Sequence, residues 1–266
     1  MIKDIGALLN KAKAEIRAQT DIAVIGLSGG ADSTLVAVLC TLALGRENVY
    51  GIHMPYGDSD YAKFNLNSKK LSDHIGIKDL TIPISYLVDD LANKFETKSR
   101  KLSTINRGNM RSRMRMVTLY TFNYDLAEET GKRCRVIGTG NLSEDYIGFD
   151  TKGGDALADF FPIGSLFKSE VYQLLDYFVS IGMLTEKLID RVPSAGLWDG
   201  QTDEGELGYS YNEMEPSIKR CTTGAGAIDI NNPIDQFVLK RHLANKHKHV
   251  GPLVIDLSEF RHNDIT

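Results

Sequence analysis

The order of apolar and polar positions predicts a chain that opens with one helix and then alternates strands with helices. Apolar residues recur at helical spacing across Ile2–Ala18, and the continuous apolar run Ile22–Gly26 predicts a buried strand. A second, strongly apolar helix is expected over Leu35–Leu44, with Asp32 or Ser33 as its natural N-cap.

The same alternation continues to about residue 140 and then weakens. Strands are expected at Val49–His53, Leu80–Ile84 and Cys134–Gly138, and helices at Ala62–Ile75 and Met110–Thr130. Alternating strands and helices predict an α/β fold with a doubly wound, parallel, five-stranded sheet that carries helices on both faces. Beyond residue 150 loop signals dominate, and the helices expected at Lys168–Ile181 and Asp235–Lys246 would form C-terminal helical and loop appendages.

Length and composition fit one globular domain over residues 1–266. The chain has 42% apolar and 25% charged residues, which is ordinary for a globular protein. The charge-free stretch Ser33–Gly45 is too short for a membrane span, which needs about 20 apolar residues. The first residues lack the pattern of a secretory signal, so we expect a cytoplasmic protein without a membrane partner.

Charge and cysteine content narrow the function classes. Three widely spaced cysteines without a CxxC pair argue against a disulfide framework or a zinc site, and cationic neighbours argue against zinc at His242, His247 and His249. A net charge of −4 disfavours a nucleic-acid partner. Residues 97–124 nevertheless contain seven cations and no acid, which fits either a phosphate-bearing ligand or a solvated helix face.

The strongest chemical signal is a glycine-rich loop between the first buried strand and the following helix. Its residues are Gly26, Leu27, Ser28, Gly29, Gly30, Ala31, Asp32 and Ser33. Glycines let backbone N–H groups approach phosphate oxygens, and the N-terminus of the next helix adds partial positive charge. The lysine of a Walker-type loop is missing, and Asp32 stands where it could bind a metal ion.

A second strand end carries Thr139-Gly140-Asn141, followed by Glu144. Ligands of parallel sheets bind at the carboxyl ends of strands, so both loops are expected to face one crevice. Carboxylates such as Asp32 and Glu144 are the oxygen ligands that Mg²⁺ prefers.

These motifs together carry a family resemblance. The segment Ser28–Ser33 resembles the SGGxDS loop of the N-type ATP pyrophosphatases, which have the adenine nucleotide alpha hydrolase-like fold. The segments 138–144, 151–155 and 158–168 are similar in order and spacing to the NAD synthetases of that superfamily. The resemblance covers about residues 20–250 and implies ATP-dependent amidation of deamido-NAD by ammonia, giving NAD, AMP and pyrophosphate through an adenylated nicotinate.

The resemblance also implies roles for individual residues. It assigns catalysis to Asp32 and Lys168, and Mg²⁺ to Asp32 and Glu144. The co-substrate ATP would contact the glycine-rich loop together with Thr139, Lys168 and Ser194. Deamido-NAD would contact Arg113, Lys152, Asp159, His247 and Lys248.

In this family the dinucleotide lies across a homodimer interface, so the resemblance implies a homodimer. Because only about 25 residues precede the glycine-rich loop, no glutaminase domain is expected, and ammonia should be the direct nitrogen donor. Two alternatives remain: another N-type ATP pyrophosphatase, either tRNA-modifying or an amide ligase, and a noncatalytic nucleotide-binding sensor.

Overall fold

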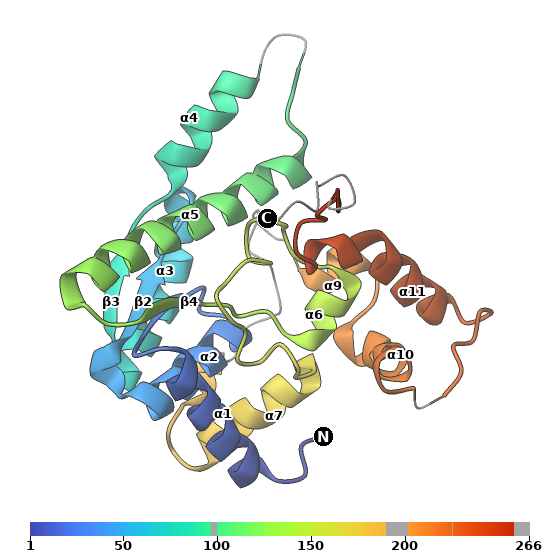
Figure 1. The fold of residues 1–266 in the computed structure, drawn as a ribbon, viewed down its shortest axis with the longest axis horizontal. Coiled ribbons are helices and arrows are strands. Elements are labelled where there is room, and N and C mark those ends of the chain that lie inside the picture. The colour runs from blue at the N-terminus through green and yellow to red at the C-terminus, as the bar shows by residue number, and fades with distance from the viewer. Residues whose placement is uncertain (97–99, 190–201, 225, 258–266) are drawn as a thin grey trace, which may run out of the picture.

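The computed structural model describes residues 1–96, 100–189, 202–224 and 226–257, without the side chains of 58–66. Four parallel strands form one sheet in the order β3-β2-β1-β4. Figure 1 labels β3, β2 and β4 of this sheet. The four strands are β1 (Ile22–Gly26), β2 (Val49–His53), β3 (Lys78–Thr81) and β4 (Cys134–Ile137). The prediction of a parallel α/β sheet is therefore confirmed.

The described residues contain four strands where five were expected. Beside β4 the expected fifth strand is reduced to a single parallel bridge between Ile137 and Phe160. The amide of Gly138 donates to the Phe160 carbonyl at 2.9 Å, but the chain then reaches Pro162, which has no N–H to continue a ladder.

The third strand was also misplaced: it spans Lys78–Thr81 and not Leu80–Ile84. It is the edge strand, and its side chains are exposed or half-buried, so an apolar run was the wrong signal for it. The apolar Ile84 is fully buried, but it directly precedes helix α4 (Ser85–Phe95).

Helices cover both faces of the sheet, as a doubly wound fold requires. In β1, Ala23 and Ile25 pack into a core shared with α1 (Ile5–Gln19), α2 (Ala31–Leu44), α3 (Gly57–Ile75) and α7 (Lys168–Ser180). The alternate residues Ile22 and Val24 pack against α4 and α5 (Thr104–Thr130) on the other face. Because β1 is buried on both faces, its sequence reads as a continuous apolar run.

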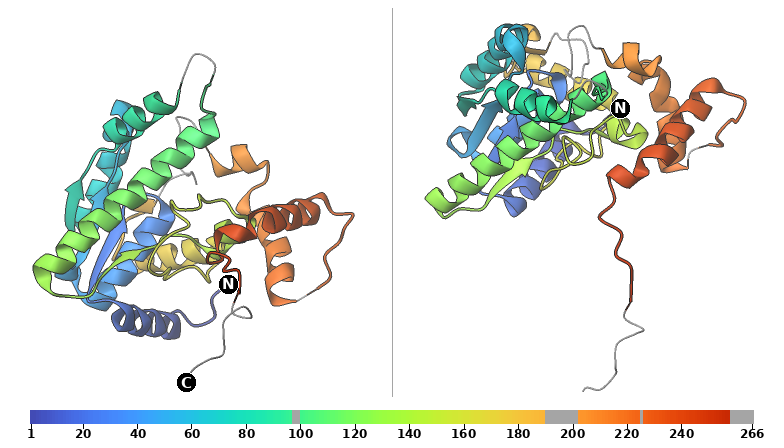
Figure 2. Two further views of the ribbon diagram at one scale, coloured as in Figure 1. Left: turned by 45° about the horizontal axis from the view of Figure 1, so that its top comes forward. Right: turned by 90° about the horizontal axis from the view of Figure 1, so that it is seen from above.

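A C-terminal helical appendage is present, as expected, and has a small core of its own. Its main helices are α6 (Leu142–Ile147), α10 (Tyr211–Thr223) and α11 (Pro233–Asn245), and they lie to one side of the sheet (Figure 2). Helix α7, which was expected in this appendage, does not belong to it, because Val171, Leu174 and Phe178 pack into the core beside the sheet. Shorter elements are η1 (Arg46–Asn48), α8 (Glu186–Ile189), α9 (Asp203–Leu207) and η2 (Lys246–Lys248). No described helix is both long and apolar enough to cross a membrane.

Several helix boundaries differ from the sequence-based prediction. Helix α2 begins at Ala31 with Gly30 as its N-cap, so Asp32 and Ser33 lie inside the first turn and do not cap it. Helix α1 begins at Ile5, because the Asp4 side chain accepts a hydrogen bond from the Ala7 amide. Helices α3 and α5 begin earlier than expected, at Gly57 and Thr104.

Gly51 in β2 lies very close to Leu27 of the glycine-rich loop. A Cβ at this position would lie 2.3 Å from Leu27 Cδ1 and 3.1 Å from Leu27 Cγ, so Leu27 would have to move. We expect Gly51→Ala to lower the free energy of unfolding by about 1–3 kcal/mol, as overpacking does.

Thermal and denaturant unfolding measure this effect. Gly6→Ala is the matched control, because Gly6 is exposed in α1 and alanine there should stabilise the helix by about 0.5–1 kcal/mol. Equal stability of Gly51→Ala and the wild type would contradict the close contact.

Candidate active site

The glycine-rich loop joins β1 to α2 and is held in shape by its own serines. The Ser28 hydroxyl accepts a hydrogen bond from the Gly30 amide at 3.2 Å and lies 3.1 Å from the Ser33 hydroxyl. Gly29 has a φ of +74°, in the left-handed region that favours glycine. The N-terminus of the 14-residue helix α2 follows directly, and such a terminus suits an anion.

A buried lysine joins this loop to the end of β4. Lys168, the first residue of α7, is 4% exposed, and its Nζ donates to Asp32 Oδ2 at 2.5 Å and to Glu144 Oε1 at 2.9 Å. Asp32 comes from α2 and Glu144 from α6, so three helices meet at one ammonium group. The structure thus brings together three of the residues that the sequence singled out.

Asn141 fixes the two carboxylates relative to each other. It is fully buried, its Nδ2 donates to Asp32 Oδ1 at 2.9 Å, and its Oδ1 accepts from the Glu144 amide at 3.1 Å. The second of these bonds caps α6. Thr139 lies half-buried in the same loop, between β4 and Asn141.

Burial and charge shift the acid–base properties of this cluster. Burial alone would lower the pKa of Lys168, but the adjacent Asp32 and Glu144 carboxylates outweigh it and raise that pKa, so the lysine stays charged. Burial raises the pKa of Glu144, as does the Asp32 carboxylate, while Lys168 opposes both effects. The site therefore holds a permanent cation beside carboxylates that are partly shielded from water.

Four of the five residues predicted to contact the dinucleotide converge near α5. Arg113 Nε donates to the Lys152 carbonyl at 3.2 Å, and Lys152 Nζ donates to the His247 carbonyl at 3.0 Å. Lys248 Nζ donates to the carbonyls of Gly148 and Asp150, at 2.8 and 2.7 Å, and these two residues precede Lys152 in the same loop. Cationic side chains from α5, the loop after α6 and η2 therefore share one region.

Asp159 lies at a different place, against β4 and α5. Its Oδ2 accepts a hydrogen bond from the Val136 amide at 2.7 Å, and its amide donates to the Val136 carbonyl at 2.9 Å. Burial, together with the Asp159 carboxylate, raises the pKa of Tyr120 to about 12. Ser194, the remaining predicted ATP contact, lies outside the described residues.

The loop that carries Lys152 is pinned to α5. Asp155 Oδ1 accepts hydrogen bonds from the Ser112 hydroxyl at 2.7 Å and from the Thr151 amide at 2.9 Å. A Cβ on Gly154 would lie 2.2 Å from Ser112 Oγ, so glycine is needed for this close approach. The position of Lys152 is thereby fixed before any ligand binds.

Much of the basic segment 97–124 is used within the fold. Arg107 forms an ion pair with Glu96 at 2.8 Å, and the Arg111 guanidinium lies 3.6 Å from the centre of the Tyr56 ring. Each of these two arginines therefore makes a contact within the fold. Neither of the two interpretations of the basic run, a phosphate-bearing ligand or a solvated helix face, accounts for that contact.

Among the described residues, a group of potential metal ligands consists of Asp145 in α6, Asp150 in the loop after it and His249 after η2. His249 Nε2 is 2.6 Å from Asp150 Oδ2, and Lys248 Nζ is 3.4 Å from Asp150 Oδ1. The hydrogen bond to Asp150 raises the pKa of His249. Lys248 and His249 thus already pair with the Asp150 carboxylate, and these pairs connect η2 to the end of α6.

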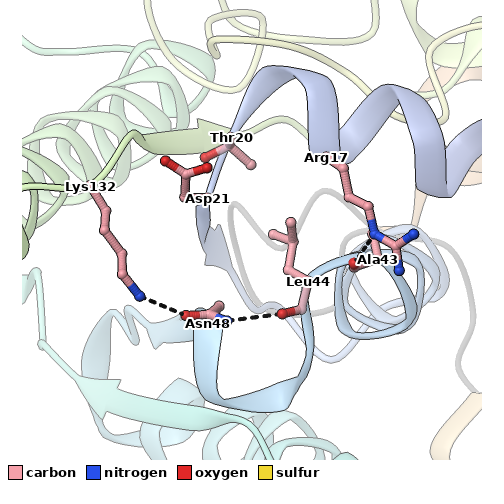
Figure 3. A pocket seen from close by; sticks show the side chains of 7 residues that line it. All are labelled: Arg17, Thr20, Asp21, Ala43, Leu44, Asn48 and Lys132. Atoms are coloured by element: carbon pink, nitrogen blue, oxygen red, sulfur yellow. Dashed lines mark hydrogen bonds between the residues drawn. The ribbon is translucent and has the colours of Figure 1, made fainter.

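A hollow at the other end of the sheet is a poor candidate for the active site. Figure 3 shows that it lies at the amino ends of β1, β2 and β4, where Lys132 donates to Asn48 at 3.4 Å and Arg17 donates to the Ala43 carbonyl at 2.6 Å. Ligands of parallel sheets bind at the opposite, carboxyl ends. The Lys168 cluster is therefore the candidate active site.

The sequence-based choice of site residues missed Asn141, Glu215 and Tyr211. Asn141 could have been found, because asparagine followed three residues later by glutamate is a helix-start signal. Glu215 and Tyr211 come from α10, about 70 residues away in sequence from α6, and only the tertiary packing places them under Lys168.

Fold and site together define an α/β protein with a glycine-rich strand-to-helix loop and an acidic pair at the carboxyl ends of parallel strands. The sequence matches the model of the NAD synthase family over residues 1–252. The NH(3)-dependent NAD(+) synthetase of Methanosarcina acetivorans is 38% identical over 247 residues, which cover 91% of this chain and 92% of that protein. The chain belongs to the NAD synthase family.

Solved structures agree with this assignment. The NH3-dependent NAD synthetase of Campylobacter jejuni superposes with a TM-score of 0.75 at 29% identity, covering 95% of this chain and 100% of that one. An NMN synthetase from Francisella tularensis superposes with a TM-score of 0.77 at 28% identity, covering 94% and 98% of the two chains. The fold expectation drawn from the sequence is confirmed.

Substitutions at Asn141 separate its capping role from its contact with Asp32. Asn141→Ala removes both bonds, and we expect a loss of about 1–3 kcal/mol in the free energy of unfolding, since buried partners are left unsatisfied. Asn141→Asp can still cap α6 but places a negative charge against Asp32, so nucleotide binding should change while the α6 cap is kept.

Denaturant unfolding and nucleotide titration measure the two effects. The same loss of stability and the same nucleotide affinity in both variants would contradict the separate roles. Asn106→Ala on the exposed first turn of α5 is the control and should leave both properties unchanged.

Proposed function

We propose that this chain catalyses the ATP-dependent amidation of deamido-NAD with ammonia, forming NAD, AMP and pyrophosphate. Membership of the NAD synthase family and NH(3)-dependent NAD(+) synthetase relatives that match nearly the full chain support this reaction. The observation that carries the proposal is the Lys168 cluster: one buried cation and two carboxylates stand beside a glycine-rich loop at a helix N-terminus.

The reaction divides into two steps. In the first, an oxygen of the nicotinate carboxylate attacks the α-phosphorus of ATP, and the bond from that phosphorus to the bridging oxygen breaks to release pyrophosphate. In the second, ammonia attacks the carboxyl carbon of the adenylate, loses a proton, and AMP leaves with the C–O bonding electrons. A free carboxylate is a poor acyl donor, and its adenylate supplies the missing leaving group.

Lys168 and the loop stabilise the first step. Charge grows on the departing pyrophosphate, and donors that are fixed in advance stabilise such charge better than water does. In our proposal the amides of Ser28–Ser33 and the N-terminus of α2 bind the phosphates, with Thr139 and Ser194 as further contacts. A cation about 4 Å from a phosphate oxygen contributes on the order of 4 kcal/mol at an effective dielectric near 20. Lys168 at that distance would therefore stabilise the phosphate charge substantially.

The residues present fit a magnesium ion. The carboxylates of Asp32 and Glu144 already share one cation, the Lys168 ammonium, and both are partly open to solvent, at 17% and 18% exposure. Carboxylate oxygens are the hard ligands that Mg²⁺ prefers. We propose that these two residues hold Mg²⁺, which when bound would neutralise phosphate charge.

The dinucleotide is assigned to the cationic region around α5. Arg113, Lys152, His247 and Lys248 would bind its phosphates, with Asp159 as an acceptor for ribose hydroxyls. In the present structure Asp159 binds the Val136 amide, so its second carboxylate oxygen is the one proposed for the ligand.

A homodimer is part of the same proposal. Large apolar side chains on α4 and α5 are exposed, including Tyr86 at 79%, Phe95 at 51% and Tyr124 at 66%. A second copy that packed against these helices would lie beside α5, which also carries Arg113. The single-domain organisation over 1–266, direct use of ammonia and the cytoplasmic location stay predictions.

The reaction is tested by an end-point assay with purified protein, ATP, Mg²⁺, deamido-NAD and ammonium, in which chromatography resolves the products. We expect NAD, AMP and pyrophosphate in equal amounts, and no NAD when glutamine replaces ammonium. Nicotinate mononucleotide is the matched alternative acceptor, because one similar structure is an NMN synthetase. Preference for the mononucleotide, or ATP binding without any amide product, would overturn the proposal.

Substitutions at the cluster test the assigned roles. Asp32→Ala should abolish turnover at every magnesium concentration, and Lys168→Ala should lower kcat by about 10²- to 10³-fold, because each removes a charge fixed near the phosphates. Lys132→Ala, at the amino ends of the strands, is the control and should keep the wild-type rate. A rate near that of wild type in either cluster variant would refute its role.

A further inference from the structure

The helix that carries Lys168 begins without a capping side chain of its own. Its N-cap is Phe167, which has no side-chain acceptor, and the Phe167 amide is bound by Glu170 Oε2 at 3.0 Å from within the helix. The next amides, those of Lys168 and Ser169, therefore need acceptors from elsewhere, since buried N–H groups are costly to leave unpaired.

Glu215 supplies one of these acceptors from a different helix. It lies on α10, is 3% exposed, and its Oε1 accepts from the Ser169 amide at 2.8 Å. Its Oε2 accepts from the Ser169 hydroxyl at 2.5 Å. A carboxylate at a helix N-terminus also interacts favourably with the helix dipole.

The same carboxylate reaches the helix that carries Glu144. Ser143 in α6 donates its hydroxyl to Glu215 Oε1 at 3.2 Å, and its oxygen accepts from the Lys168 amide at 3.0 Å. Glu215 thus binds the residue before Glu144 and the residue after Lys168. These two neighbours set the backbone positions from which the Lys168–Glu144 ion pair is made.

Helix α10 also approaches the Lys168 side chain from its first turn. The centre of the Tyr211 ring is 5.5 Å from Lys168 Nζ, and the Tyr211 hydroxyl donates to Asp203 Oδ2 at 3.0 Å. One turn of α10 separates Tyr211 from Glu215, so the helix contacts the Lys168 ammonium through Tyr211 and the amide of the next residue, Ser169, through Glu215.

We propose that Glu215 is a positioning residue that holds Lys168 and Glu144 in register for the adenylyl-transfer step. The inference rests on the proposed function, because it assumes that both residues act on ATP. Glu215 itself is buried beneath the two helix starts and touches neither substrate nor metal in this role. A displacement of about 1 Å at a reacting group can lower a rate about 10²-fold, so a shift of α7 against α6 should appear mainly in kcat.

A purely structural role for Glu215 is the alternative, and Asp235 provides the matched control. Asp235 is also a fully buried carboxylate of the appendage, and it binds Ser217, Arg220 and the Asp229 amide between α10 and α11. None of these three partners belongs to α6 or α7. Asp235→Ala should therefore lower the melting temperature and leave kcat at the wild-type value.

The experiment compares kcat, the KM for ATP and the melting temperature of the full-length wild type, Glu215→Ala, Glu215→Gln and Asp235→Ala. We expect Glu215→Ala to lower kcat about 10- to 100-fold with a KM for ATP within about threefold of wild type. Glu215→Gln should recover most of kcat, because its amide oxygen can accept from the Ser169 amide and its NH₂ can donate to the Ser169 hydroxyl.

If Glu215→Ala does not fold, Ser143→Ala takes its place, because it removes the acceptor of the Lys168 amide and the contact with Glu215. It should lower kcat in a protein that still folds, with a melting temperature reduced no further than that of Asp235→Ala. A wild-type kcat in the folded Glu215 and Ser143 variants, or an equal loss of kcat in Asp235→Ala, would overturn the inference. Inactivity of the wild type would instead count against the proposed reaction.

Discussion

The ammonium group of Lys168, held by Asp32 and Glu144, is the interaction on which the active site depends. Burying a lysine costs several kcal/mol unless paired charges and hydrogen bonds offset the loss of hydration. Here two carboxylates at 2.5 and 2.9 Å provide that compensation for a side chain that is 5% exposed. Because the three charges belong to α2, α6 and α7, the ion pairs fix the relative positions of three helices.

The sheet makes this meeting possible. Strands β1 and β4 pair in parallel, with Ile25 opposite Ile137, so the loops that follow them leave the same edge side by side. Asn141 then binds Asp32 across the gap between those loops and caps α6 with the same side chain. A sheet with these strands apart would separate the carboxylates, whatever the sequence of either loop.

The sequence predicted those parts of the molecule whose signals are local. The buried strand Ile22–Gly26 and the glycine-rich loop combine apolar periodicity with glycine chemistry, and both are found as expected. The edge strand β3 was misplaced because its polar residues carry no apolar signal, and the fifth strand is reduced to one bridge because Pro162 cannot extend it.

Within the site, residues that belong to sequence motifs can be predicted from the sequence, whereas the residues that hold them in position cannot. Asp32, Glu144 and Lys168 stand in recognisable motifs, so the family resemblance identifies them from the sequence alone. Glu215 has no motif of its own, and its role follows from the burial of α10 against the starts of α6 and α7. A supporting residue of this kind is defined by contacts across the fold, which periodicity and spacing do not contain.

The paired state of the charges explains how such a site can exist before ligands bind. The Lys168 ammonium is satisfied by two carboxylates, and Arg113 and Lys152 donate to backbone carbonyls. An entering phosphate would find these donors already held in place, so part of the cost of desolvation is met during folding and not during binding. Donors already fixed in place need little reorganisation when charge develops on the departing group, and this is the condition for strong electrostatic stabilisation of a transition state. The support of α7 by α10 belongs to the same requirement, because preorganised charges are effective only while the helices that carry them keep their positions.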